Sequence, residues 1–69
     1  MAGRATALQT ITGREQQVLD QILRGASNKE IADALGCAVK TVESHVASLL
    51  RKFDVDSRLK LAVAANLSQ

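Results

Sequence analysis

Two capping boxes lie close together in the first half of this chain and fix where two helices begin. Thr12 is followed three positions later by Glu15, and Ser27 stands in the same relation to Glu30. In a capping box the hydroxyl accepts a hydrogen bond from an amide of the first helical turn, and the acidic side chain reaches back to the cap. This spacing predicts helix starts directly after residues 12 and 27.

Apolar stripes and glycines give these two helices their length. Gly25 and Gly36 each follow a stretch of apolar residues at helical spacing, and such a glycine supplies the left-handed conformation that ends many helices. We therefore expect helices over about 13–24 and about 28–35. The stripes consist of Val18, Leu19, Ile22 and Leu23 in the first helix and Ile31, Ala32 and Leu35 in the second.

The second half of the chain predicts two further helices. Apolar residues at one helical face predict a helix over about 39–53, and a polar break with cap-type residues follows it. An Ala- and Leu-rich run after the break predicts a last helix from 58 to about 67. The face of the third helix consists of Val42, Val46, Leu49, Leu50 and Phe53.

These elements predict an all-α fold in one compact domain. No segment alternates apolar and polar residues as a strand would, and 69 residues suffice for a single small core. We expect a four-helix domain over residues 11–67, a flexible lead-in over residues 1–10 and a tail at residues 68–69.

Composition narrows the classes of function. The one cysteine, Cys37, and the one histidine, His45, exclude an internal disulfide and leave no Cys/His cluster for a metal. Phe53 is the only aromatic residue, so stacking platforms for single-stranded bases are lacking. No nucleophile stands beside a base and no carboxylates are paired, which argues against an enzyme and leaves no cofactor to expect.

Charge and hydropathy add two expectations. The formal net charge of +2 permits a nucleic-acid partner without demonstrating one. The longest apolar stretch covers residues 61–65, far fewer than the roughly 20 residues of a membrane span. We expect a soluble cytoplasmic protein with no membrane partner.

The second and third helices form the segment that points to function. A tight turn containing Gly36 joins them, which is the arrangement of a helix-turn-helix. Opposite its apolar stripe, the third helix has an outward polar face, for which an ordinary solvated surface is the simplest explanation. This face holds Lys40, Glu43, Ser44, Ala47 and Arg51.

Several stretches in fixed register resemble a known family. They are Thr12-Gly-Arg-Glu15, the run from Gly25 through Asn28 to Leu35, Thr41-Val42-Glu-Ser-His45-Val46, and Lys52 to Arg58. Together they resemble the DNA-binding effector domain of LuxR/NarL/FixJ-type (GerE-like) bacterial transcription regulators over about residues 11–67. The resemblance implies that the helix at 39–53 enters the major groove of double-stranded DNA and that the last helix makes a dimer contact on DNA.

The same resemblance implies partners beyond DNA. Members of this family are usually the output half of a response regulator or of a ligand-sensing activator. An upstream sensor or receiver domain, which this chain lacks, and RNA polymerase are therefore further expected partners.

The resemblance suggests which side chains contact bases. Lys40, Glu43, Ser44 and Ala47 are the candidates, and they include no arginine to recognise guanine. Glu43 suits a cytosine amino group, Ser44 can donate or accept, and Ala47 suits a thymine methyl. An equally open alternative is that Glu43 only neutralises Lys40 in solvent and that Ala47 is only a small side chain that makes no contact.

Phosphate contacts are expected on both sides of the turn. The resemblance places near DNA several side chains whose donors suit phosphate oxygens. They are Asn28, Lys29, Thr41, Lys52 and Arg58. For Arg58 an alternative is open, in which it pairs with Asp54 or Asp56.

Three positions depart from or stand apart from this pattern. Ala38 occupies the cap position before the third helix, where the family usually has Ser or Thr, so a capping bond of about 1 kcal/mol should be missing. For His45 a packing or anchoring role is favoured over DNA contact. For Cys37 the role of a small buried apolar residue is favoured over redox sensing.

The last helix has two apolar faces, one more than a monomer needs. Leu61, Ala62 and Ala65 lie on one side, and Leu59, Val63 and Leu67 lie nearly opposite. We expect the first set in the core and the second in a weak symmetric contact between two copies on two DNA half-sites. The alternative is that the second set is a scatter of exposed aliphatic residues.

Two other functions compete with sequence-selective DNA binding for transcriptional regulation. A sigma-factor-like promoter-recognising domain shares the first three helices, but it would normally stop after a more Arg-rich recognition helix. A protein-interaction module would use the third and fourth helices to bind a partner helix without touching DNA.

Overall fold

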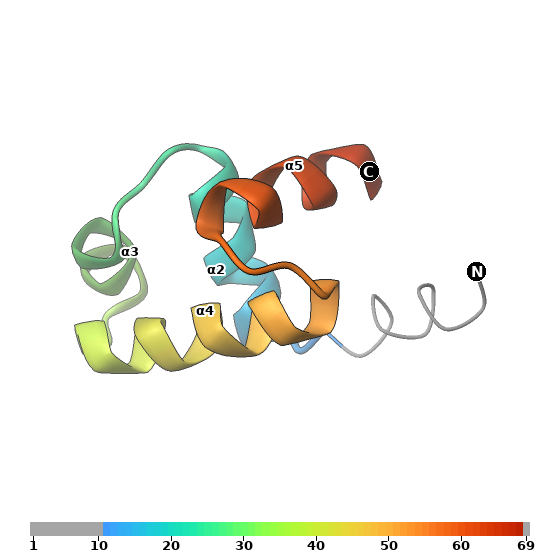
Figure 1. Ribbon diagram of the computed structural model, residues 1–69. Helices are drawn as coiled ribbons and strands as arrows, with labels where there is room; N and C mark the ends of the chain where they lie inside the picture. The colour runs from blue at the N-terminus through green and yellow to red at the C-terminus, as the bar shows by residue number, and fades with distance from the viewer. Residues whose placement is uncertain (1–10, 69) are drawn as a thin grey trace.

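The computed structural model describes residues 11–68 and folds them into four helices with no strand among them. The helices are α2 (Gly13–Leu23), α3 (Asn28–Leu35), α4 (Val39–Phe53) and α5 (Arg58–Ser68) (Figure 1). This confirms the all-α, four-helix prediction. The expected lead-in at residues 1–10 lies outside the described residues.

The helix boundaries differ from the sequence prediction by one residue at two places. The first helix ends at Leu23, because Arg24 has already left helical geometry with φ −88° and ψ 0°. The last helix continues through Ser68, a position that the sequence assigned to a tail. The other boundaries agree, including both ends of α3 and of α4.

Both capping boxes form as predicted. The Thr12 hydroxyl accepts a hydrogen bond of 3.1 Å from the Glu15 amide, and the Glu15 carboxylate accepts one of 3.0 Å from the Thr12 amide. Ser27 and Glu30 repeat this exchange at 3.2 and 2.7 Å. The N-cap of α4, Ala38, has no side-chain hydrogen bond, as its methyl side chain dictates.

Left-handed residues follow three of the helices, and two of the three were expected. Gly25, after α2, has φ 85°, as predicted. Gly36 closes α3 at φ 69°, as predicted. Asp54 closes α4 at φ 57°, a conformation that a short polar side chain tolerates better than most. The Val55 amide then donates to the Leu50 carbonyl at 3.0 Å, which turns the chain sharply towards α5.

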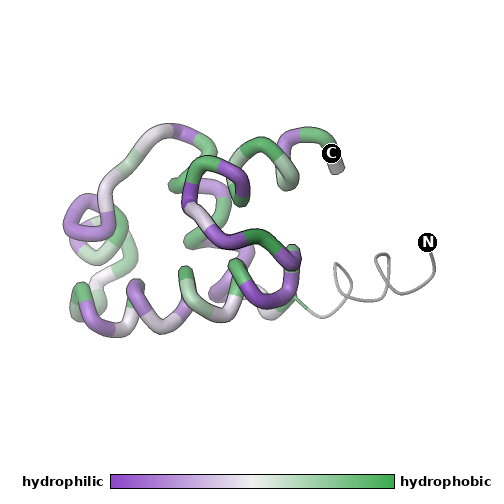
Figure 2. The backbone as a smooth tube through the Cα atoms, in the orientation of Figure 1, coloured by the Kyte–Doolittle hydropathy of each residue, from purple (hydrophilic) through white to green (hydrophobic). Residues whose placement is uncertain are grey.

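The core is built from aliphatic side chains of all four helices. α4 packs against each of the other three, with α3 across its N-terminal end and α5 above it in the view of Figure 1. In Figure 2 hydrophobic and hydrophilic residues alternate along α4, whereas α5 is hydrophobic over most of its length. The buried apolar residues are Val18, Leu19, Ile22, Ile31, Ala32, Val42, Leu49, Leu61 and Ala65.

One carboxylate is buried with this core. Glu15 is only 5% exposed, and its Oε2 accepts a hydrogen bond of 2.6 Å from the Ser48 hydroxyl. Its Oε1 accepts from Lys52 Nζ, also at 2.6 Å, in addition to the Thr12 amide. The capping residue of α2 therefore also binds two side chains of α4, more than thirty positions away in the sequence.

These contacts set the charge state of Glu15. Burial raises its pKa, but the hydrogen bonds from Lys52, Ser48 and the Thr12 amide together outweigh burial and lower the pKa from 4.5 to about 2. A carboxyl group whose pKa is lowered by folding stabilises the folded state above its unfolded pKa, and this contribution is lost as the pH falls towards the folded pKa.

Glu15→Gln should therefore lower the free energy of unfolding by about 3 kcal/mol at pH 7, because the shift in pKa corresponds to an energy of that order. The difference from wild type should shrink between pH 4.5 and about 2, where the wild-type carboxylate takes up its proton. Urea unfolding followed by circular dichroism across this pH range measures it.

Glu30→Gln is the matched control, since Glu30 forms the same capping box on an exposed surface without a tertiary partner among the described residues. It should cost less than about 1 kcal/mol. Equal losses for the two variants, or a loss at Glu15 that does not change with pH, would show that the buried contacts do not stabilise the fold.

Candidate nucleic-acid interface

The turn between α3 and α4 has the helix-turn-helix form that the sequence predicted. After Gly36, the Cys37 amide donates to the Ala32 carbonyl at 3.0 Å, and α4 begins after Ala38, whose backbone is extended. Cys37 is half-buried and packs against the core, as expected for a small apolar residue. These contacts hold α3 across the N-terminal end of α4 (Figure 1).

α4 divides into a buried face and an exposed face. Val42 and Leu49 are fully buried, whereas the predicted base-contact residues are all exposed. We call these four the outer face of α4: Lys40, Glu43, Ser44 and Ala47. The predicted division of the helix is confirmed, and contact of the outer face with DNA stays a prediction.

Two of the five predicted phosphate contacts are exposed and unengaged. Lys29 lies in the first turn of α3 and Thr41 in the first turn of α4, so both stand beside helix N-termini, where amides favour anions. Within residues 11–68 neither side chain makes a hydrogen bond or an ion pair. They remain available to a phosphate.

The other three predicted phosphate contacts are engaged within the domain. Lys52 Nζ lies 2.6 Å from Glu15 Oε1, and its side chain is only 26% exposed. Arg58 Nη1 donates to Asn28 Oδ1 and Arg58 Nη2 to the Ala26 carbonyl, both at 2.6 Å. Lys52 thus connects α4 with α2, and the bond between Arg58 and Asn28 connects α5 with α3.

The alternative for Arg58, an ion pair with Asp54 or Asp56, is wrong. The guanidinium group reaches back to the start of α3, and Asp56 pairs instead with Lys60 at 3.0 Å. Lys60 lies four positions after Asp56, and both side chains are largely exposed, so this pair contributes little to stability.

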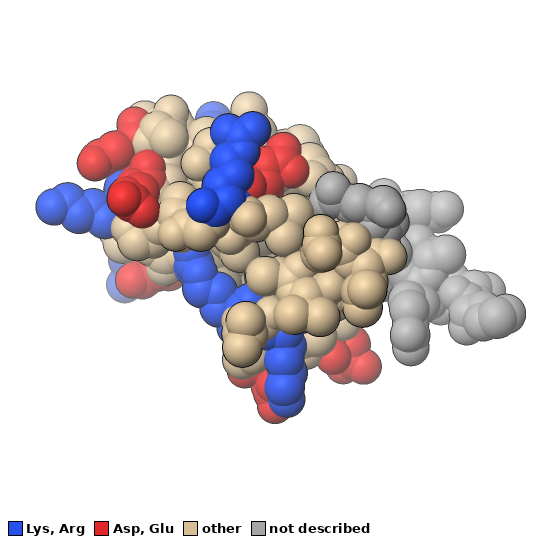
Figure 3. Space-filling model, turned by 90° about the horizontal axis from the view of Figure 1, so that it is seen from above, with Lys and Arg blue, Asp and Glu red and all other residues tan. Residues whose placement is uncertain are grey.

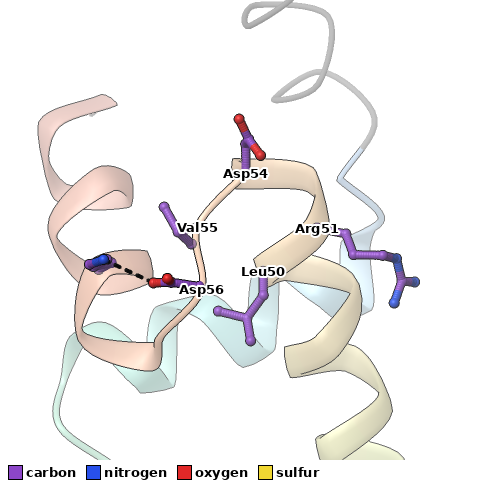
Figure 4. Close-up of a pocket in the computed structure, with 6 residues that line it drawn as sticks. Leu50, Arg51, Asp54, Val55 and Asp56 are labelled. Atoms are coloured by element: carbon purple, nitrogen blue, oxygen red, sulfur yellow. Dashed lines mark ion pairs between the residues drawn. The ribbon is translucent and has the colours of Figure 1, made fainter.

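A hollow lies at the turn between α4 and α5. Leu50 and Val55 form its apolar wall, and Figure 4 shows the ion pair of Asp56 with Lys60 at one side and Arg51 pointing away from it. At this hollow the charges of Asp56 and Lys60 neutralise each other. His45 is half-buried on the flank of α4, and its role stays a prediction.

α5 presents the two faces expected from its sequence. Leu61 and Ala65 are buried in the core, and Ala62 is half-buried. On the opposite side Leu59 is 74%, Val63 52% and Leu67 80% exposed. Figure 3, in which the molecule is seen from above, shows an uncharged area bordered by both basic and acidic side chains. We call Leu59, Val63 and Leu67 the outer face of α5.

Sequence reasoning missed the long-range polar contacts of this region. Ser48 was not singled out, and Glu15 was recognised only as a cap, although the two bond to each other. The only signal was an acid and a base on helices expected to pack together, which does not say which charges meet. The contact of Arg58 with the Ala26 carbonyl could not be predicted either, because a backbone atom carries no sequence signature.

Metal and membrane sites find no support in the described part of the chain. Within residues 11–68 no three His, Cys, Asp or Glu side chains are grouped as metal ligands. None of the four described helices combines the length and the apolar character that a membrane crossing requires.

Comparison with known proteins gives a consistent result. Residues 9–65 match the family described as bacterial regulatory proteins, luxR family (GerE). The chain is 49% identical over 55 residues to the uncharacterized transcriptional regulatory protein YhcZ of Bacillus subtilis (strain 168), covering 80% of this chain and 26% of that protein. It is 38% identical over 65 residues to the response regulator protein VraR of Staphylococcus aureus (strain Mu3), covering 94% and 31%.

The chain thus spans roughly a quarter to a third of the length of these relatives. The matched segment contains α2, α3, α4 and most of α5, which is the helix-turn-helix with the helices that support it. With this geometry and this match, the chain belongs to the luxR family of bacterial regulatory proteins and contains its DNA-binding helix-turn-helix domain.

Proposed function

We propose that this domain binds double-stranded DNA selectively by sequence and thereby regulates transcription, without chemistry of its own. The observation that carries the proposal is the outer face of α4, which is solvent-exposed beside a helix-turn-helix while the opposite face of the same helix is buried. In this arrangement the second helix lies in the major groove and the first crosses the backbone. A cytoplasmic location in bacteria belongs to the same proposal.

In this proposal the small and polar side chains on the outer face of α4 select the bases. Lys40 suits guanine, Glu43 suits the amino group of cytosine and Ala47 suits a thymine methyl, while Ser44 can donate or accept. Because one of the four is an acid that phosphates repel, we expect discrimination between sites to depend more on matched bases than on net charge.

Backbone contacts in the proposal come from Lys29 and Thr41. Both are exposed in the first turns of the two helices that meet at the turn. Asn28, Lys52 and Arg58 are left out of the direct contacts, because Lys52 Nζ, both terminal nitrogens of Arg58 and Asn28 Oδ1 already bond within the domain.

The outer face of α5 supports a proposal of weak pairing between two copies. Three large aliphatic side chains are exposed on one side of one helix, and an isologous contact of two such faces would give the two-fold symmetry of two half-sites. A contact of one short helix with another is small, so DNA should provide much of the assembly energy.

We also propose that other proteins control this domain. One relative is named a response regulator, so an input domain that controls this one and a contact with RNA polymerase at the promoter are in keeping with the match. The sigma-factor-like alternative is disfavoured, because α5 packs against α2 and α4 as part of the fold.

The outer face of α4 generates a first DNA-binding prediction. Lys40→Ala and Ser44→Ala should each weaken binding to a duplex selected from a random pool by about tenfold, since each removes a group that meets a base edge. Both variants should keep the wild-type circular dichroism spectrum, because both side chains are exposed. Lys60→Ala removes the same charge as Lys40→Ala far from α4's outer face and should bind normally.

Unchanged affinity in both α4 variants would reject α4 as the recognition helix. Phosphate contacts are strongest at low salt. If the wild-type domain retains no duplex even at low salt, DNA binding is rejected and the protein-interaction alternative replaces it.

Lys29→Ala should weaken binding to every duplex alike, because a phosphate contact carries no sequence information. The slope of log affinity against log salt should fall by about 0.9, since the variant neutralises one phosphate fewer. Fluorescence anisotropy at several salt concentrations measures this slope. A slope equal to that of wild type would show that Lys29 does not touch the backbone.

Val63→Glu should abolish cooperative binding to a duplex with two half-sites while leaving the helical spectrum unchanged, because the charge falls on the outer face of α5. Leu61→Ala, on the buried face of the same helix, should instead lower the free energy of unfolding by about 2 to 5 kcal/mol. Opposite phenotypes at these two positions test the assignment of the faces. Wild-type cooperativity in folded Val63→Glu would exclude α5 as the pairing surface.

A further inference from the structure

Arg58 connects two helices that do not otherwise touch. In the described residues α5 packs against α2 and α4 but makes no helix–helix contact with α3. Arg58, the first residue of α5, nevertheless bonds to Asn28, the first residue of α3, and to Ala26 just before it. The side chain thus spans from the proposed pairing helix to the helix-turn-helix.

The geometry of this contact is directional. Two nitrogens of one planar guanidinium group donate at 2.6 Å each, one to a side-chain amide oxygen and one to a backbone carbonyl. Such a fork fixes both the distance and the orientation of the group, which a lysine ammonium cannot do. Ser27, between the two acceptor residues, is itself held by its capping box, so the backbone that carries both acceptors is ordered at this helix start.

α5 needs such a restraint, because its apolar packing specifies its rotation poorly. Apolar residues occur on both sides of the helix, and its inward side consists of Leu61 and Ala65, which are buried, and Ala62, which is half-buried. A rotation about the helix axis would exchange one set of aliphatic residues for the other at little cost in buried apolar area. The polar link at residue 58 resists that rotation.

We propose that Arg58 is a positioning residue, which fixes the rotation of α5 so that Leu59, Val63 and Leu67 stay on the pairing surface at one angle to the helix-turn-helix. This inference rests on the proposed function. Two copies paired through α5 then present their recognition helices at a single separation. The domain selects the spacing of half-sites in this way, at positions of the DNA that it does not touch.

The physical consequence is a penalty for wrong spacing. Inserting one base pair moves a half-site by about 3.4 Å along the helix and rotates it about the axis, since a turn contains about 10 base pairs. A rigid pair must distort to follow, whereas a pair with a loose α5 follows easily. Loss of the link should therefore reduce both cooperativity and spacing preference.

The test uses the full chain and duplexes built from the half-site that the wild-type domain selects from a random pool. Affinity is measured for one half-site and for two half-sites at the selected spacing and at one base pair more or less. The variants are Arg58→Lys, which keeps the charge but loses the fork, Arg58→Gln, which removes the charge, and Asn28→Ala, which removes one acceptor. Lys60→Gln is the control, since it removes an exposed charge from the same turn of α5.

We expect Arg58→Lys and Asn28→Ala to bind the single half-site within about twofold of wild type, with an unchanged salt slope. Cooperativity on the selected pair should fall by about tenfold, and the preference among spacings should flatten. The double variant should be no worse than Arg58→Lys alone, because both changes break one link. Lys60→Gln should behave as wild type.

Wild-type spacing preference in folded Arg58→Lys and Asn28→Ala would overturn the inference. A salt slope lowered by about 0.9 in Arg58→Gln, with Arg58→Lys restored to wild type, would also overturn it, because Arg58 would then be a direct phosphate contact. If the wild-type domain binds paired half-sites without cooperativity, the proposed pairing fails first, which this design distinguishes from failure of the link alone.

Discussion

The carboxylate of Glu15 is the constraint on which the arrangement of the domain depends. It caps α2 through the Thr12 amide and at the same time binds Ser48 and Lys52 of α4. The rest of the core is aliphatic, and apolar contact is non-directional, so it does not by itself fix the angle between helices. The buried carboxylate supplies direction at the crossing of α2 with the helix that we propose enters DNA.

α4 belongs to the core and, in the proposed function, also to the DNA interface, which would allow so short a chain to bind DNA. Val42, Leu49 and the ion pair of Lys52 fix one side of the helix. The other side is therefore held rigid, and its own side chains remain free to contact a partner. A preorganised surface loses less conformational entropy on binding. The same logic extends to α5, where the Arg58 fork adds direction to an apolar contact.

Much of the fold could be predicted from the sequence because its signals are local. Capping boxes, apolar stripes and Gly36 act within a few residues, and they placed the helices to within one residue. What could not be predicted is long-range or backbone-directed. Glu15 and Lys52 lie 37 positions apart, and Arg58 reaches a carbonyl 32 positions earlier. The left-handed Asp54 was missed because aspartate adopts that conformation only in some contexts.

Amide chemical shifts report on whether the outer face of α4 enters the major groove, as we propose. A ¹⁵N-labelled sample titrated with the selected duplex should show its largest shifts at residues 40–47, with a second group in the first turn of α3. The hollow between α4 and α5, lined by Leu50 and Val55, should remain unchanged when a single half-site is bound. Largest shifts at that hollow or along the outer face of α5, with α4's first turns unaffected, would contradict the account.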